Sequence, residues 1–217
     1  MALPLARNEE ARKAPYERES TALLFVDMQE IFCHPGLDPA HADWGKDHYF
    51  FTRLRETVIP NQQRLLAAAR GAGINVLHTV IEALTSDGRD ISLDHRLSGI
   101  FIPRGAPEGR PISELNPIDN EIVLPKTSSG VFNSTAIDYV LKNLGTKFLI
   151  IAGVVTDQCV DMAVRDAADR GYLVSLPEDA SATHTPERHA AALGAFGGYC
   201  WVTTTGEVVA RIEALAR

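Results

Sequence analysis

The sequence contains little cysteine and no long apolar segment. Its 217 residues include only three cysteines, Cys33, Cys159 and Cys200. These are too few and too scattered for a disulfide framework or a cysteine-rich zinc site. No apolar run approaches the ~20 residues of a membrane span, and the charged N-terminal segment lacks the apolar stretch of a signal peptide. We therefore expect a cytoplasmic protein without a membrane partner, in which each cysteine is a free thiol.

Basic residues are also scarce. The chain has 21 Lys and Arg against 28 Asp and Glu, a formal net charge of −7, and no run rich in Lys or Arg. Because an acidic protein repels phosphate backbones, nucleic acid is not an expected partner. Apolar residues make up 45% of the chain, which is typical of a globular core. The length suits one α/β domain, so we expect a loosely held polar arm over residues 1–19 and a single domain over 20–217.

Short apolar runs and helical patterns follow one another along the chain. The runs fit strands that are buried on both faces; they cover 21–27, 74–80, 120–125, 147–153, 171–176 and, more weakly, 199–204. Helical patterns with polar N-terminal residues or C-terminal glycines lie between several of them; they cover 56–73, 133–145, 157–171 and 185–197. This order predicts an α/β fold with a doubly wound, mostly parallel six-stranded sheet and helices on both faces.

Two segments are expected to surround the ligand site. Such sheets bind ligands beyond the carboxyl ends of their strands. The segment 33–55 follows the first strand, and the long segment 82–119 follows the second. The second segment is rich in Gly, Pro and charge, so we interpret it as an excursion near the site or a subunit contact. We expect the two segments, with or without a neighbouring subunit, to build the pocket walls.

Three residues with reactive side chains lie at or just after the ends of predicted strands. Asp27 follows the first apolar run, Lys126 follows the third, and Cys159 lies in the first turn of the helix after the fourth. Taken alone, Asp27 could be a helix cap, Lys126 a solvated loop charge and Cys159 a small buried residue. Taken together, they lie at the sheet edge where ligands bind. A thiol in the first turn of a helix is expected to have a lowered pKa.

The same three residues can support acyl transfer. A lysine beside the thiol favours the thiolate, and an adjacent carboxylate can carry the thiol proton. Backbone N–H groups of the turn 154–159 would face an oxyanion formed on attack. The pattern therefore predicts a nucleophile, a base, a cation and oxyanion donors at one edge of the sheet.

At this point three motifs resemble a known family. They are DMQEIF (27–32), PKTSSGVF (125–132) and GVVTDQCV (153–160). In order and spacing they are similar to the isochorismatase-like cysteine hydrolase superfamily, which includes nicotinamidases, N-carbamoylsarcosine amidase, ureidoacrylate amidohydrolases and biuret hydrolases. The resemblance spans nearly the whole chain, and the combination of motifs is specific where any single one would be weak.

The resemblance implies a mechanism with assigned roles. Cys159 would attack the amide carbonyl and form a thioester, while Asp27 would act first as general base and then as acid. Lys126 would hold the pair in its charged arrangement. A cis peptide bond between Val154 and Val155 would aim the amides of Val155 and Cys159 into an oxyanion hole. The family also implies a homo-oligomer, either a dimer or a tetramer.

The resemblance also suggests residues that contact the substrate. Phe32 matches an aromatic residue that lines the family's pocket, and Val154 is placed in the pocket with it. Phe132 faces the pocket or belongs to the ordinary core, and these two interpretations are equally favoured. The roles of His184 and Arg104 stay open. His184 lies near the pocket or has a capping or surface position, and Arg104 meets a substrate carboxylate or solvent.

Departures from the family pattern narrow the expected reaction. Metal-dependent nicotinamidases carry an Asp-x-His pair that the segment 76–90 lacks, so neither a metal nor another cofactor is expected. Isochorismatase itself cleaves a vinyl ether and needs no cysteine, so Cys159 favours C–N cleavage. The leading hypothesis is therefore an amidohydrolase that acts on a small linear amide, above all a carbamoyl or ureido compound, and releases ammonia or an amine.

Three other hypotheses stay open. The first is a nicotinamidase-like amidase. The second is a papain-like thiol hydrolase that pairs Cys159 with a histidine, for which only His78 is suggestive. The third is a non-catalytic binding protein that kept the fold. Of the other two thiols, Cys33 lies near the expected site and could be oxidisable, whereas Cys200 is expected in the core.

Overall fold

The computed structural model describes residues 8–216 as seven strands and nine α-helices, with short 3₁₀ and π-helical turns between them. The strands are β1 Thr21–Val26, β2 Asn75–Ile81, β3 Ile122–Lys126, β4 Phe148–Val154, β5 Leu173–Pro177, β6 Ser181–Ala182 and β7 Cys200–Thr203. The helices are α1 Glu30–Cys33, α2 Tyr49–Arg53, α3 Ile59–Ala72, α4 Leu93–Leu97, α5 Val131–Ser134, α6 Ile137–Asn143, α7 Cys159–Asp169, α8 Pro186–Ala195 and α9 Thr205–Glu213. No helix among these residues is both long enough and apolar enough to cross a membrane.

The strands form one parallel sheet in the order β3-β2-β1-β4-β5-β7, and the short β6 pairs with β4. All six predicted strands are present, and β6 was not predicted. The chain builds the sheet outward from β1 through β2 and β3, then returns to the other side of β1 with β4. The order therefore reverses between β1 and β4, which is where doubly wound sheets bind their ligands.

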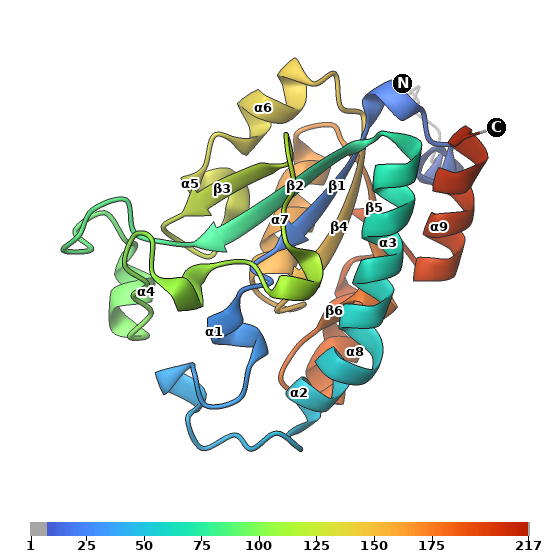
Figure 1. Ribbon diagram of the computed structural model, residues 1–217. Helices are drawn as coiled ribbons and strands as arrows, with labels where there is room; N and C mark the ends of the chain where they lie inside the picture. The colour runs from blue at the N-terminus through green and yellow to red at the C-terminus, as the bar shows by residue number, and fades with distance from the viewer. Residues whose placement is uncertain (1–7, 217) are drawn as a thin grey trace, which may run out of the picture.

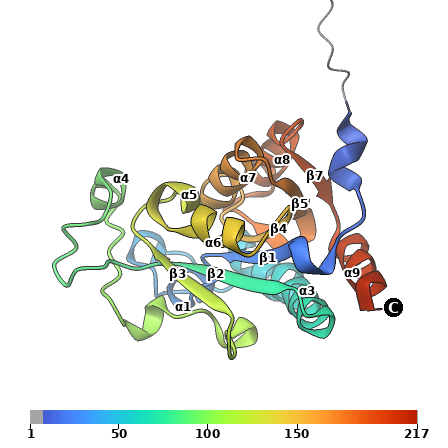
Figure 2. The same ribbon diagram turned by 90° about the horizontal axis from the view of Figure 1, so that it is seen from above.

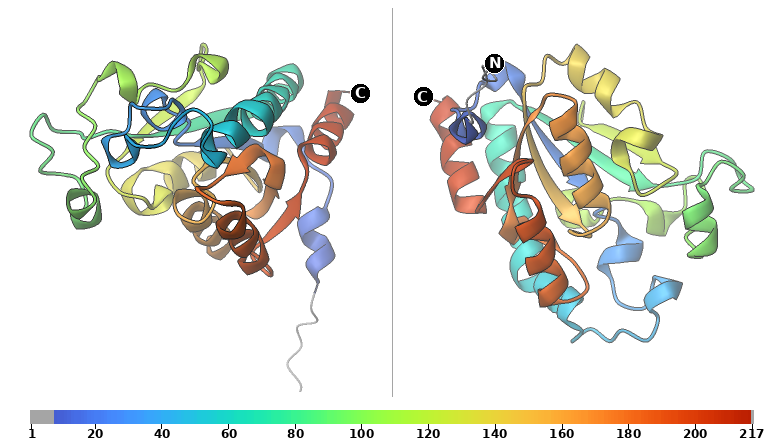
Figure 3. Two further views of the ribbon diagram at one scale, coloured as in Figure 1. Left: turned by 90° about the horizontal axis from the view of Figure 1, so that it is seen from below. Right: turned by 180° about the vertical axis from the view of Figure 1, so that it is seen from behind.

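Helices cover both faces of the sheet, as the sequence predicted (Figures 1 and 2). One core layer joins Leu23 and Phe25 of β1 to buried residues of α3 and α9. The other joins Ala22 and Leu24 of β1 to α5, α6, α7 and α8. Seen from behind, α7 and α8 lie over this second face (Figure 3). The alternation follows from strand geometry, since successive side chains point to opposite faces. It explains why β1 is apolar throughout.

Where the strand order reverses, the backbones of β4 and β1 approach each other closely. Gly153, near the end of β4, has φ +135°, and a Cβ there would lie 2.2 Å from the Val26 carbonyl oxygen. No residue other than glycine fits this position, because an added methyl would overlap the neighbouring strand. The contact presses the end of β4 against the end of β1. It therefore sets the distance between the loop that leads to Cys159 and the residue that follows Val26.

The N-terminal arm is held more firmly than the sequence indicated. Residues 1–7 lie outside the described residues, but within 8–19 the side chain of Tyr16 belongs to the core on one face of the sheet. Tyr16 is 5% exposed, and its hydroxyl donates to Ser175 Oγ at 2.8 Å. Arg211 of α9 donates to the Lys13 carbonyl at 2.7 Å. The expectation of a loose arm is therefore wrong for this stretch, because one aromatic side chain enters the core despite the polar residues around it.

Candidate active site

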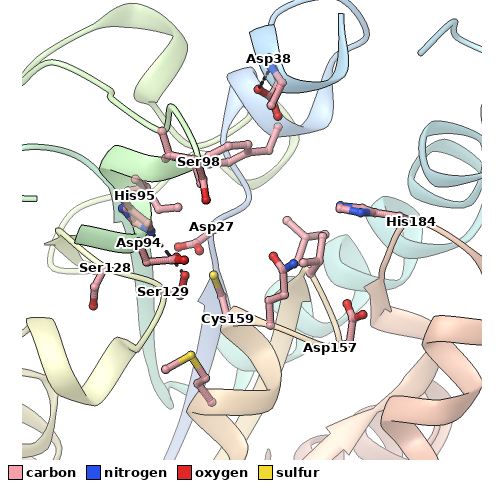
Figure 4. A pocket seen from close by; sticks show the side chains of 18 of the residues that line it. Asp27, Asp38, Asp94, His95, Ser98, Ser128, Ser129, Asp157, Cys159 and His184 are labelled. Carbon is pink, nitrogen blue, oxygen red and sulfur yellow. Dashed lines mark hydrogen bonds between the residues drawn. The ribbon is translucent and has the colours of Figure 1, made fainter. Parts of the chain in front are cut away.

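Three side chains from three strand ends meet below a pocket. The Lys126 ammonium lies 2.9 Å from Asp27 Oδ2 and 3.5 Å from Cys159 Sγ. Lys126 is fully buried, Asp27 is 2% exposed and Cys159 is 7% exposed. Figure 4 shows Asp27 and Cys159 side by side on the pocket floor. The structure thus brings together the residues that the sequence singled out, in an arrangement with little contact with water.

Asp27 is held by the end of the neighbouring strand. Its φ of +54° lies in the left-handed region, which turns the chain sharply after β1. Its amide donates to the Thr79 carbonyl at 3.1 Å, and the Thr79 hydroxyl donates to Asp27 Oδ1 at 3.1 Å. These bonds leave Oδ2 facing Lys126 and the thiol.

Gln29 stabilises the same turn, a role that the sequence did not predict. Its side chain is fully buried. Its amide group donates to the carbonyls of Ile81 at 3.0 Å and Gly109 at 2.7 Å, and its carbonyl accepts from the Ile81 amide at 2.7 Å. A buried amide with all these partners is well satisfied. It ties the end of β1 to the end of β2 and to the segment 82–119.

Lys126 is held by backbone carbonyls as well as by its charged partner. Its ammonium donates to the carbonyls of Ser128 at 2.8 Å and Ser129 at 3.3 Å. Burial alone would lower the pKa of Lys126, but the charge of Asp27 and the hydrogen bonds to Asp27 and Cys159 raise it. The side chain is therefore a permanent cation that balances the carboxylate.

Cys159 is the first residue of α7; the sequence predicted a start near Asp157, with Cys159 in the first turn. The expectation that its pKa is lowered there is wrong: burial raises the pKa of the thiol to about 12. Lys126 opposes this rise, and the charge and hydrogen bond of Asp27 add to it. The reason is that Lys126 already faces a carboxylate, so the pair offers little net charge to offset desolvation. The thiol is protonated at neutral pH.

Two backbone amides beside the thiol are free to donate. Among residues 8–216, the N–H groups of Val155 and Cys159 bond to no protein acceptor, whereas those of Thr156, Gln158 and Val160 do. For Cys159 this follows from its place at the helix start, where the first N–H groups have no partner within the helix. The Val154–Val155 peptide bond is cis.

A pocket of about 790 Å³ opens above the three side chains. Its wall includes Asp27, Phe32, Val154, Val155 and Cys159. The segments 33–55 and 82–119 supply much of the remainder, as expected.

Two other candidates lie elsewhere. Phe132 is absent from the pocket wall and only 7% exposed; its ring packs against Tyr172 and under Arg170, so the core interpretation holds. Arg104 is exposed and is not part of the wall. His184 does line the pocket, beside Arg188, which contacts its Nδ1 at 3.0 Å.

Sequence reasoning missed several wall residues in the two loops. Trp44 and His41 come from the first segment, and Asp94 and His95 from the second. His95 is fully buried, with Nε2 3.4 Å from Ser129 Oγ and no partner for Nδ1. Asp38, Pro39 and His41 belong to a short 3₁₀ turn capped by Asp38. Only this local Asp-Pro signal pointed to structure there.

The remaining histidine and thiol candidates lie away from the pocket. His78 is buried inside β2, where burial lowers its pKa to about 4, and it packs on the Phe25 ring. Cys33 and Cys200 are buried, and burial raises the pKa of both thiols. Within the described part of the chain, no three His, Cys, Asp or Glu side chains converge as a metal ion would require.

Comparison with known proteins agrees with this architecture. A family model described as the isochorismatase domain matches residues 21–207. A cysteine hydrolase from Pseudomonas syringae pv. phaseolicola 1448A is 28% identical, with a TM-score of 0.78 over 99% of this chain and 100% of that one. An isochorismatase family protein from Desulfovibrio vulgaris is 27% identical, with a TM-score of 0.72 over 91% of this chain and 99% of that one.

A more distant structure shares the fold. N-carbamoylsarcosine amidase from Thermoplasma acidophilum is 22% identical, with a TM-score of 0.68 over 86% of this chain and 98% of that one.

Proposed function

Because this chain belongs to the isochorismatase family, we propose that it is a cysteine-dependent amidohydrolase. The substrate is a small linear amide, in particular a carbamoyl or ureido compound, and the bond cleaved is C–N. The single observation that carries the proposal is the buried group of Asp27, Lys126 and Cys159, in which Asp27 and Cys159 line the pocket and Lys126 lies beneath them. A protonated thiol beside a carboxylate and a fixed cation is suited to acyl transfer.

The first half of the reaction forms a thioester. Asp27 takes the thiol proton as the sulfur of Cys159 attacks the carbonyl carbon, and Lys126 offsets the negative charge that develops. The carbonyl oxygen becomes an oxyanion that the free amides of Val155 and Cys159 can stabilise. Asp27 then returns the proton to the nitrogen, the C–N bond breaks, and ammonia or an amine leaves. Phe32 and Val154 contact the bound acyl group.

The second half restores the enzyme. Water attacks the thioester carbon while Asp27 accepts one of its protons, and the C–S bond breaks. The proton passes to the departing sulfur, and the acid product leaves; a carbamic acid product then breaks down to carbon dioxide and the second nitrogen product, an amine or ammonia. Every proton is accounted for by Asp27, the substrate and one water. This route needs no resting thiolate, which suits the raised pKa of Cys159.

Ammonia release from purified protein tests the proposal. We expect Cys159→Ser to lower kcat by at least about 1000-fold on any amide or ureide that the wild type cleaves, the size expected when a covalent nucleophile is lost. Cys200→Ser is the matched control, because it makes the same change in a thiol that does not line the pocket. Full activity in Cys159→Ser would refute the mechanism. Binding without turnover of any amide would favour the non-catalytic hypothesis.

A homo-oligomer is part of the proposal. Leu93 and Leu97 of α4 are 71% and 80% exposed, and neighbouring exposed leucines are a surface that a second copy can cover. Light scattering coupled to size-exclusion chromatography measures the assembly directly.

A further inference from the structure

The pocket is larger than a simple ureide requires. Its volume of about 790 Å³ lies in the upper part of the roughly 300–1,000 Å³ range of sites that hold drug-sized ligands. A compound with only the reacting C–N group would fill the space above Cys159 and leave the rest to water. The walls farther from the thiol therefore bear on which substituent the substrate carries.

One side of the pocket is aromatic. Trp44 stacks on His48 with ring centroids 4.0 Å apart and contacts His41 at 3.8 Å. His184 meets the Trp44 ring edge-on at 4.9 Å and the Phe50 ring at 5.8 Å. We call Trp44, His41, Phe50 and His184, all of which line the pocket, the aromatic wall.

The imidazole of His184 adds no charge to this wall. Burial, with the nearby charge of Arg188, lowers the pKa of His184 to about 4. The ring is therefore neutral at pH 7 and presents an uncharged aromatic surface. Figure 4 shows His184 on one side of Cys159 and the polar group of His95, Ser98 and Ser129 on the other.

The formal charges that line the pocket are carboxylates. Asp38, Asp94, Asp157 and Asp161 belong to the wall in addition to Asp27, and among the described residues that line it there is no lysine or arginine. Opposite charges lie behind two of these acids: Asp157 accepts from Arg188, and Asp161 from Arg165 at 2.9 Å. Asp38 faces the imidazole of His41 at 2.8 Å.

The nearby cations are already engaged. Arg188 is bound by Asp157 and His184, and the Lys126 ammonium is enclosed by Asp27, Cys159 and two carbonyls. A carboxylate on the substrate would lose water without gaining a cation, and it would be repelled by the acids that line the pocket. The wall therefore disfavours ureido acids and other anionic amides.

We propose that the substrate is an uncharged amide or ureide with an aromatic or similarly flat apolar substituent, which stacks against the aromatic wall while the reacting carbonyl lies over Cys159. The inference rests on the proposed hydrolase activity and narrows it. Among carbamoyl and ureido compounds, it favours ureides with an aromatic substituent over the smallest ureides and over ureido acids.

A matched substrate series tests the inference. Benzylurea supplies the ring without charge, its 4-carboxy derivative adds one negative charge to the same ring, and methylurea lacks the ring. We expect kcat/KM for ammonia release to be at least about 100-fold higher for benzylurea than for the carboxylated twin, and at least about 10-fold higher than for methylurea. These ratios correspond to roughly 2.7 and 1.4 kcal/mol of discrimination.

Two variants assign each preference to its residues. Trp44→Ala should lower the benzylurea-to-methylurea ratio of kcat/KM at least 10-fold. Tyr139→Ala, a matched loss of an aromatic ring that is 71% exposed and outside the pocket, should leave that ratio unchanged. Asp94→Lys places a cation on the exposed rim of the wall, and it should raise the relative kcat/KM of the carboxylated twin at least 10-fold.

The outcomes separate this inference from the hydrolase proposal. Cys159-dependent hydrolysis that favours the carboxylated twin or methylurea would overturn the inference and leave the hydrolase proposal intact. A benzylurea preference that Trp44→Ala does not alter would also overturn it. If no amide or ureide is cleaved in a Cys159-dependent way, the hydrolase proposal fails and the inference fails with it.

Discussion

At the scale of single residues, the electrostatics of the candidate site decide how its thiol can react. Cys159 shares a dry site with a cation and a carboxylate that largely cancel each other. Desolvation is then the largest influence on the thiol and raises its pKa to about 12. Nucleophilicity must therefore be produced during attack, by proton transfer to Asp27. This differs from cysteines whose neighbourhood stabilises a resting thiolate.

The raised pKa predicts slow chemical labelling of Cys159. An ordinary thiol with a pKa near 8.5 is a few per cent ionised at pH 7, and a pKa near 12 reduces that fraction by roughly three orders of magnitude. We expect iodoacetamide to alkylate Cys159 at least about 100-fold more slowly than a free peptide thiol at pH 7. The rate should rise about tenfold per pH unit between pH 7 and 9.

Peptide mass spectrometry of timed samples measures this rate at each cysteine. Cys159→Ser identifies the peptide that carries the pocket thiol. A rate that is fast at pH 7 and flat up to pH 9 would show a resting thiolate, and the assignment of Asp27 as the base for attack would then be wrong.

At the scale of elements, the sequence predicts the strands better than the loops. Buried parallel strands are continuous apolar runs, so the six main strands were recognisable, as was a helix with Cys159 in its first turn. Their carboxyl ends share one sheet edge, which is why Asp27, Lys126 and Cys159 could be grouped. The short β6 and the helices α1, α2, α4 and α9 were not predicted.

Other parts of the site could not be inferred in this way. Trp44, Asp94 and His95 lie in segments whose shape depends on tertiary contacts such as those of Gln29, and such contacts leave no periodic pattern in the sequence. The raised pKa of Cys159 was missed for a related reason. Burial and the balance of neighbouring charges become known only when the three strand ends are placed together.

The contact between β4 and β1 predicts that Gly153 is irreplaceable. In Gly153→Ala the new methyl would meet the backbone of Val26 at 2.2 Å, and φ +135° is unfavourable for alanine. We expect a loss of about 4 kcal/mol or more in the free energy of unfolding, because neither strand can move without disrupting the sheet. Urea denaturation followed by circular dichroism measures the loss.

Gly145→Ala is the matched control for the backbone conformation. Gly145 also has a positive φ, +67°, but a Cβ there meets nothing within 4 Å. It should cost only about 1–2 kcal/mol, the strain of a left-handed alanine. Equal losses for the two variants would show that φ alone matters and that the close approach of the strands does not.

At the scale of the whole molecule, buried protonated groups tie stability to pH. Burial raises the pKa of Cys33, and it raises the pKa of Cys159, Cys200 and Tyr16 to about 12. In the unfolded chain the thiols titrate near 9, so above that pH the unfolded state binds fewer protons than the folded state. The free energy of unfolding then falls as pH rises. The stabilisation is complete below about pH 8 and is lost progressively between about pH 9 and 12.

Cys200 isolates one thiol's share of this loss. It is 8% exposed, and a thiol that titrates near 9 only when unfolded contributes about 1.4 kcal/mol to the decline between pH 8 and 10. We therefore expect the wild type to lose about 1.4 kcal/mol more than Cys200→Ala over this interval, as measured by urea denaturation under reducing conditions. The constant cost of the smaller side chain cancels in this difference, since it is present at both pH values. Equal declines in the two proteins would mean that Cys200 ionises as easily in the folded state as in the unfolded chain, and that its burial does not exclude water.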